Sequence, residues 1–235
     1  MNLWRWTAVG AICVAATTAS ACNDMTEGSP TARSSASTSA KPSKTMTAAP
    51  SGPSATNEAP PFGVVPTTRA PIPAAEVTCS PPVRPGVLIV AKVADPHAPQ
   101  VTVPVPGGWQ LTRGSGDVAT RMEGPDGAMA TVTIAETKLD AARAFREYAD
   151  HQTAGYAVSA LSLLPGELCD YSGQKLTGTL SNTSQDAIKF VDRIVHVWTN
   201  TNDYLVAVHV QAPPDFTDLD AVGDVITGDF EIRIP

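Results

Sequence analysis

The sequence lacks the short motifs that mark common catalytic sites. No G-x-S-x-G nucleophile motif occurs: Gly114-Ser115-Gly116 has the wrong spacing, and Asp170-Tyr171-Ser172-Gly173 has no leading glycine. The stretch from Gly114 to Ala119 fits G-x-G-x-x-A. However, the turn residues Gly124-Pro125-Asp126-Gly127 follow it where a dinucleotide site needs a helix. We therefore expect a loop there, no catalytic residues and no cofactor.

Metal-binding patterns are also missing. The chain has four histidines and four cysteines, with no H-E-x-x-H, no histidine pair at i, i+4 and no C-x-x-C. His196 and His209 fall on neighbouring strands of an expected hairpin. In an antiparallel hairpin the residue numbers of directly paired residues add up to a constant. His196 and His209 share a face of the sheet only if that constant is odd. The sequence predicts no metal site and no redox-exchange motif.

Basic charge is scarce relative to acidic charge. From Val77 onward the chain carries eleven Lys or Arg against nineteen Asp or Glu, a net charge of about −8. Such a surface repels phosphate backbones and anionic lipid headgroups, so we expect no nucleic-acid partner and no basic membrane-binding face. Any contact with a membrane must come from another feature.

Cys22 supplies that feature, because it follows a short leader. Arg5 precedes an apolar stretch from Thr7 to Ala16, which is typical of a signal peptide and too short to span a bilayer. Ala19-Ser20-Ala21 then places small residues next to the thiol that a lipoprotein signal peptidase requires. Residues 1–21 are predicted to be a lipoprotein signal peptide, and Cys22 the lipid-attachment site. Ala19 stands where Leu is usual, so general secretory cleavage at the same A-x-A triplet is the alternative.

Residues 22–76 form a tract of Ser, Thr, Ala and Pro with few large apolar residues. Such a composition cannot offset the entropy of ordering, so we expect a disordered tether that holds the domain away from the membrane. The tract is either an inert spacer or an acceptor of O-glycosylation.

Residues 77–235 are long enough to form one globular domain. After removal of the leader and lipidation of Cys22, Cys79 and Cys169 remain. In an exported domain the pair predicts a disulfide, the alternative being two separate buried thiols.

Hydrophobic periodicity predicts alternating strands and two helices in this domain. Residues 139–153 and 217–227 repeat apolar side chains at three and four, as amphipathic helices do. Strands are expected over residues 128–135, 173–182, 187–199 and 204–211, and the turn residues Asn200 to Asp203 join the last two as an antiparallel hairpin. The run Val87 to Ala91 fits either a strand or a helix. This order predicts an α+β domain built as an α/β/α sandwich around a mainly antiparallel sheet.

Aromatic side chains offer the one candidate binding surface. Trp109, Trp198 and Tyr204 could line a ligand groove, although core packing and cross-strand pairing are the expected roles of such residues. Paired carboxylates such as Glu136 with Asp140, or Asp218 with Asp220, stand at helix starts, where capping is the expected role.

The leader, the tether, the segment Val103-Pro104-Val105-Pro106-Gly107-Gly108-Trp109 and the hairpin-rich sheet together resemble the LpqN/LpqT-type lipoproteins of mycobacteria. The resemblance implies a curved antiparallel sheet between helices, as in Mog1 and PsbP, and supplies no catalytic residues. The chain has Pro85-Gly86-Val87-Leu88 in place of the family's usual residues before that segment.

These observations predict a lipid-anchored protein on the extracytoplasmic face of the cell membrane, in part shed or secreted. Its domain is expected to bind a ligand or protein partner without catalysis. A carrier of an envelope lipid or glycolipid is the first alternative, and a hydrolase with a site built from distant loops is the second.

Overall fold

The computed structural model describes residues 61–82, 86–183 and 186–235. The predicted signal peptide, Cys22 and the tether as far as residue 60 lie outside the described residues. Within them, no helix has the length and apolar character that crossing a membrane requires.

The described residues form a succession of strands with two α-helices and one short 3-10 helix, η1 (Pro125–Gly127). The helices are α1 (Ala141–Thr153) and α2 (Leu219–Ile226). The strands are β1 (Val77–Cys79), β2 (Val87–Ala91), β3 (Gln100–Val105), β4 (Gln110–Arg113), β5 (Val118–Glu123), β6 (Met129–Thr137), β7 (Val158–Pro165), β8 (Ser172–Ser181), β9 (Ile188–Trp198), β10 (Asp203–Ala212) and β11 (Glu231–Arg233).

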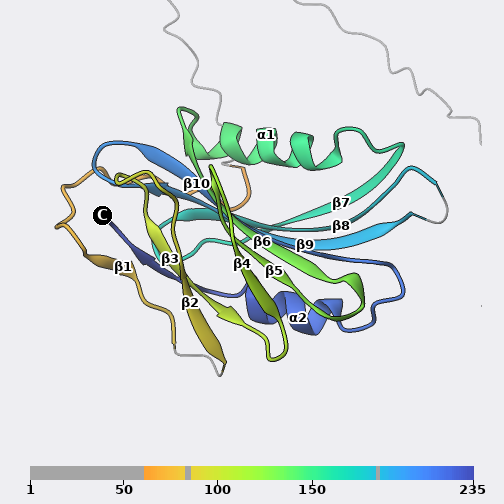
Figure 1. Cartoon of the computed structure of the whole chain (residues 1–235). Coiled ribbons are helices and arrows are strands. Elements are labelled where there is room, and N and C mark those ends of the chain that lie inside the picture. The colour runs from red at the N-terminus through yellow and green to blue at the C-terminus, as the bar shows by residue number, and fades with distance from the viewer. Residues whose placement is uncertain (1–60, 83–85, 184–185) are drawn as a thin grey trace, which may run out of the picture. The chain divides into compact units, whose positions relative to one another are not determined.

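The strands make two sheets, one of seven strands in the order β4-β5-β6-β10-β9-β8-β7 and one of four in the order β1-β11-β3-β2. The strand pairs within both sheets are antiparallel. Helix α1 covers one face of the larger sheet, while α2 and the four-stranded sheet lie on the opposite side (Figure 1). The predicted α+β sandwich with a mainly antiparallel sheet is confirmed.

The alternation of β6, β9 and β10 places a core on each face of the larger sheet. Towards α2 and the smaller sheet, Val132, Val195 and Val206 are fully buried among aliphatic and aromatic side chains. Towards α1, Phe145 packs with Ile194 and other apolar residues of β8 and β9. Both faces therefore carry apolar burial, the main favourable term in folding.

The helix and hairpin predictions hold with small shifts in their bounds. Helix α1 begins two residues later than expected, because the Asp140 side chain accepts a hydrogen bond from the Arg143 backbone N–H at 2.9 Å and caps the helix. Asp218 precedes α2 without such a side-chain cap bond. The β9–β10 hairpin forms as predicted, with Asn200 at φ +73° in its turn.

The predicted disulfide between Cys79 and Cys169 is present, with the two Cα atoms 5.8 Å apart. It joins the end of β1 to the turn before β8, across 90 positions of sequence. The run Val87 to Ala91 is a strand, but it is an exposed edge strand of the smaller sheet.

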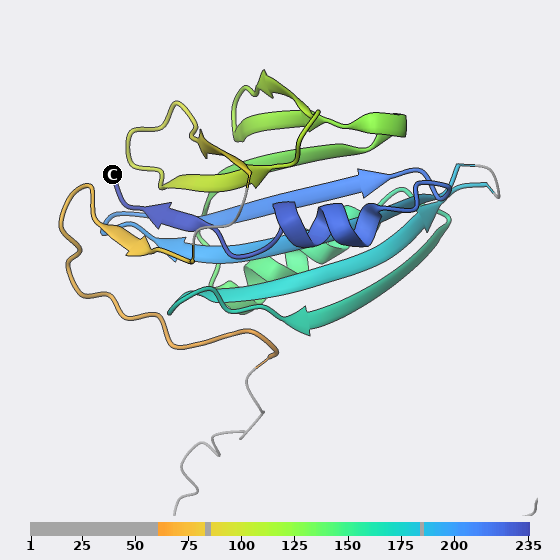
Figure 2. The same cartoon turned by 90° about the horizontal axis from the view of Figure 1, so that it is seen from below.

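Residues 61–76 differ from the prediction, because the tether was expected to be disordered up to Glu76. They run along one end of the domain before β1, as the orange segment of Figure 2 shows. Val64 packs against the α1 core and Ile72 against the opposite core. These apolar anchors, together with hydrogen bonds to β8 and the β9–β10 turn, offset the entropy of ordering.

Candidate ligand groove

A polar patch lies at one end of the face of the larger sheet that α1 covers. The register pairs Ser172 with His196 and His196 with Leu205, and the next row pairs Trp198 with Asp203 and Asp203 with Thr137. Because directly paired residues point to the same side of a sheet, these side chains share the face that α1 covers further along. Helix α1 starts only at Ala141, so this end of the face is left to other elements.

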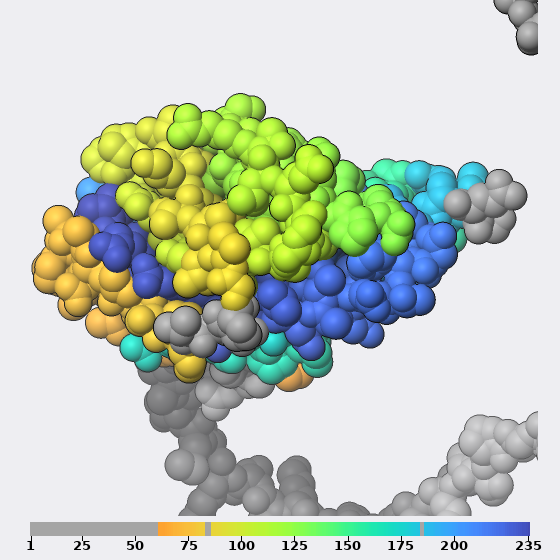
Figure 3. Space-filling model, turned by 60° about the horizontal axis from the view of Figure 1, so that its bottom comes forward, coloured from red at the N-terminus to blue at the C-terminus, as the bar shows by residue number. Residues whose placement is uncertain are grey.

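Residues 61–73, here called the strap, cross this end of the sheet. A groove of about 740 Å³ lies between the strap and the sheet, and its lining comprises residues 65–68, 70–73, 76–78 and 169–172, with His196 and Trp198. The strap begins beside β8 and reaches β1, and in the space-filling view it forms the orange surface at one end of the domain (Figure 3). The groove therefore has one wall of regular sheet and one wall of extended chain.

Ser172 and Asn200 hold the strap by its backbone. The Val65 N–H donates to Ser172 Oγ at 3.0 Å, and that hydroxyl donates to the Val65 carbonyl oxygen at 3.1 Å. The Ile72 N–H donates to Asn200 Oδ1 and Asn200 Nδ2 donates to the Ile72 carbonyl oxygen, both at 2.8 Å. Each side chain satisfies both backbone groups of one residue.

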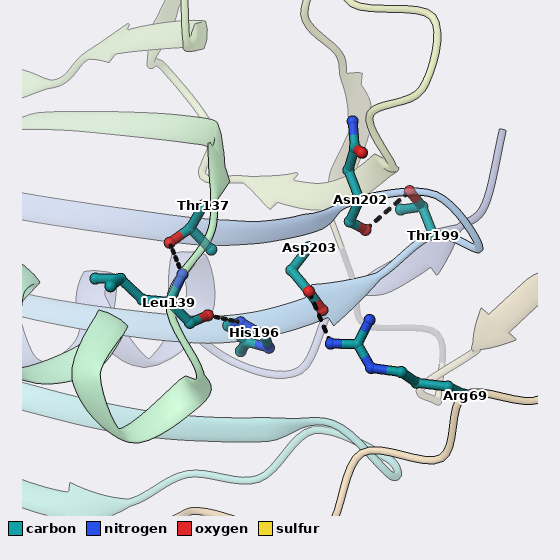
Figure 4. Close-up of polar contacts among 7 residues, drawn as sticks. All are labelled: Arg69, Thr137, Leu139, His196, Thr199, Asn202 and Asp203. Carbon is teal, nitrogen blue, oxygen red and sulfur yellow. Dashed lines mark hydrogen bonds and ion pairs between the residues drawn. The ribbon is translucent and has the colours of Figure 1, made fainter.

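Arg69 contacts the sheet through its guanidinium group. Its Nη2 lies 2.8 Å from Asp203 Oδ2 (Figure 4). Its Cζ lies 5.7 Å from the centre of the Trp198 ring. The arginine side chain is 56% exposed and the aspartate 16%. The remaining oxygen, Asp203 Oδ1, is buried with no hydrogen-bond partner among the described residues.

His196 is a buried acceptor at the groove. Its Nε2 lies 3.0 Å from the Leu139 carbonyl oxygen, and because a carbonyl oxygen only accepts, Nε2 carries the hydrogen (Figure 4). In the neutral ring Nδ1 then has a free lone pair, and it finds no partner among the described residues. With only 4% of the residue exposed, this nitrogen is a buried polar atom whose hydrogen-bonding capacity the described residues leave unused.

The remaining polar lining is acidic or neutral. Glu76 and Asp170 line the groove, and its described lining includes no lysine or arginine. Tyr171 donates to Thr78 Oγ1 at 2.6 Å, and burial raises the pKa of the Tyr171 hydroxyl, so that it stays a donor. The groove therefore favours neutral or cationic ligands that can donate hydrogen bonds.

The three aromatic residues proposed from the sequence are not brought together. Trp198 lines the groove, whereas Tyr204 pairs with Val197 and lies buried on the opposite face, where its hydroxyl donates to Asp95 Oδ2 at 2.6 Å. Trp109 lies apart, against Gly124, where a Cβ would stand 2.5 Å from the indole ring. Only Trp198 of the set faces the groove.

His196 and His209 do share a face, because Leu205 pairs with His196 and Asp192 with His209. They are separated by four positions along the strand, roughly 13 Å, and cannot bind one ion. Among the described residues no cluster of three or more metal-ligating side chains occurs.

His209 instead belongs to a buried network beneath α1. Its Nδ1 lies 2.6 Å from Asp192 Oδ1, and the Tyr148 hydroxyl donates to Asp192 Oδ2 at 2.9 Å. Burial opposes charge on the imidazole, but the hydrogen bond and charge of Asp192 outweigh it and raise the pKa of His209. Because Tyr148 comes from the helix and the other two from the sheet, the network fixes α1 on its face.

Ser172 and His196 are paired directly, yet they do not form a nucleophile–base pair. The Ser172 hydroxyl hydrogen is donated to the Val65 carbonyl oxygen, and the His196 Nε2 hydrogen to Leu139. A catalytic serine would donate to the histidine.

Comparisons with known proteins identify the fold. Neither family models nor curated protein sequences give a match. Among solved structures, the crystal structure of LpqN, involved in cell envelope biogenesis of Mycobacterium tuberculosis, aligns with a TM-score of 0.50 and 17% identity over 63% of this chain and 91% of that one. PsbP (CyanoP) of Synechocystis sp. PCC 6803 aligns with a TM-score of 0.40 and 12% identity over 64% of this chain and 96% of that one.

The domain is thus an α+β sandwich. In particular, its fold is similar to that of LpqN, which confirms the resemblance noted from the sequence at the level of the fold.

Proposed function

We propose that the protein is a lipid-anchored lipoprotein on the extracytoplasmic face of the cell membrane, whose domain binds a ligand or partner in the groove beneath the strap. The observation that supports a binding role best is the groove itself. Trp198 and the partly apolar strap line it together with His196 and Ser172, and such apolar walls with a few placed polar groups are typical of ligand sites.

The anchor and the location rest on separate features. Cys22 follows the signal-peptide pattern, and the disulfide between Cys79 and Cys169 is typical of oxidising compartments. The likeness to LpqN, a protein of cell envelope biogenesis, supports a related setting for this chain.

A carrier of an envelope lipid or glycolipid is the second candidate. It is favoured by Trp198 and by the prolines of the strap, which give one end of the groove apolar walls. The hydrolase alternative finds less support, because the hydrogen of the Ser172 hydroxyl is donated to the strap and not to His196.

Mass spectrometry of molecules extracted from the purified full-length protein tests the binding role. We expect an envelope molecule to copurify with the wild type and to fall several-fold in Trp198→Leu. The matched variant Trp109→Leu, which alters an indole outside the groove, should retain it. An acyl-bearing molecule would favour the carrier, and equal retention by both variants, or none by the wild type, would contradict binding in this groove.

A further inference from the structure

The strap is held in the manner of a bound peptide. Ser172 forms hydrogen bonds with both the N–H and the carbonyl oxygen of Val65. Asn200 does the same with Ile72. Both side chains therefore recognise the backbone of the strap and not its side chains. Gln174 Nε2 also donates to the Phe62 carbonyl oxygen at 2.7 Å. Backbone capture of an extended segment, with pockets for single side chains, is a recurrent mode of peptide recognition.

Arg69 provides the one charged side-chain anchor of the strap. It pairs with Asp203 and lies against the Trp198 ring, which together present a carboxylate and an aromatic surface to a guanidinium group. Because Arg69 is more than half exposed, its pair is screened by solvent and contributes little. The charged contact of the strap can therefore be exchanged for that of another arginine at little cost in free energy.

Two hydrogen-bond acceptors near the strap have no donor among the described residues. Asp203 Oδ1 and His196 Nδ1 are buried acceptors without partners among the described residues, and Glu76 and Asp170 add negative charge to the groove. A segment with more N–H donors than Arg69 now directs there would satisfy these acceptors. Two copies of this domain, each at about −8, repel one another, whereas a basic segment is attracted.

We propose that the surface beneath the strap is a binding site for an extended, arginine-bearing segment of a partner protein, with residues 61–73 as its occupant within the chain. The inference rests on the binding role proposed for the groove and specifies its partner. Displacing the strap would expose Trp198, Asp203 and the two backbone-binding side chains, Ser172 and Asn200, to that segment.

The test uses the full-length chain and a fluorescein-labelled synthetic peptide with the sequence of residues 61–76, followed by fluorescence anisotropy. We expect saturable binding that weakens as salt is added, and binding about fivefold weaker when the peptide carries Arg69→Ala. In the Arg69→Ala protein, whose own strap no longer uses Asp203, adding Asp203→Asn should weaken peptide binding about fivefold, the equivalent of one exposed ion pair. Asp220→Asn, on the exposed side of α2, should bind as the wild type does.

Arg69→Ala in the protein gives the sharpest result. It loosens the strap without touching the surface below, so it should strengthen peptide binding about fivefold, opposite in sign to Asp203→Asn. This variant keeps the proposal testable even if Asp203→Asn disturbs the hairpin.

Three outcomes would overturn the proposal: no saturable binding by the Arg69→Ala protein, no weakening when Asp203→Asn is added to the folded Arg69→Ala protein, or full-length dimers that exchange straps, since a second copy would then be the partner. In one further outcome, the peptide fails to bind while Trp198→Leu still loses the molecule that copurifies with the wild type. That combination contradicts the arginine-bearing partner and leaves the binding role of the groove intact.

Discussion

Three side chains between α1 and the larger sheet show how individual residues fix the arrangement of the elements. Asp192 is fully buried, and Tyr148 and His209 supply hydrogen bonds to its two oxygens. A buried carboxylate that loses a donor bears a desolvation cost. We therefore expect Tyr148→Phe to lower the free energy of unfolding by about 1–3 kcal/mol. Urea denaturation measures this, and Tyr156→Phe is the control, because the Tyr156 ring also packs against the α1 core but makes no such bond to Asp192. Equal effects of the two variants would contradict the role of the network.

The raised pKa of His209 gives the same network a dependence on pH. A folded-state pKa above the unfolded one means that the charged pair with Asp192 stabilises the fold fully below about pH 6.5 and loses this effect as the pH rises through the folded value. The stability advantage of the wild type over His209→Gln should therefore shrink as the pH rises above about 6.5. Urea unfolding of both proteins at a series of pH values on either side of this value checks the sign. An advantage that grows with pH would show that His209 is neutral in the folded protein.

At the scale of elements, the strap depends on a close approach that only glycine allows. Gly63 has φ +75°, and a Cβ there would lie 1.9 Å from the Gly173 carbonyl oxygen, while its own carbonyl accepts from the Gly173 N–H at 2.8 Å. Gly63→Ala should lift this end of the strap and speed amide hydrogen exchange at Val65. Gly116→Ala is the matched control, because its φ is +61° and its Cβ would meet open space. Similar exchange at Val65 in the two variants would argue that the contact with Gly173 does not hold the strap.

Local pattern was enough to predict α1, the β9–β10 hairpin and the disulfide, because periodicity, turn chemistry and a lone cysteine pair are signals within the sequence itself. The strap was missed because its bonds join residues more than a hundred positions apart, such as Val65 with Ser172 and Ile72 with Asn200. Strand β7 was missed for another reason: as the edge of the sheet it leaves nearly all of its side chains exposed, so it shows no buried alternation. Asp203 and His196 enter the site only once the register is fixed.

For the whole molecule, the disulfide ties the first strand of the domain to its middle and fixes one wall of the groove. Cys169 lines the groove, and Cys79 ends the strand that follows the strap. The double variant Cys79→Ser/Cys169→Ser should lose about 2–4 kcal/mol of stability, because a bridge across 90 positions restricts the unfolded chain strongly. Thermal unfolding with and without reductant measures the loss. The variant should not respond to reductant, and a wild type that is equally indifferent would contradict a stabilising bridge.

The lipid anchor proposed at Cys22 has a test that is independent of the fold. A diacylated cysteine binds a membrane stably, whereas a domain with a net charge of about −8 is repelled by anionic lipid headgroups. Cys22→Ala should therefore move the protein from the membrane fraction to the soluble fraction, as fractionation and immunoblotting would show. Cys13→Ala removes the other cysteine of the N-terminal region, within the predicted signal peptide, and should leave the protein at the membrane. Release of the wild type itself, with a mass that shows cleavage after Ala21 and no lipid on Cys22, would favour general secretion and place the groove in the extracellular medium.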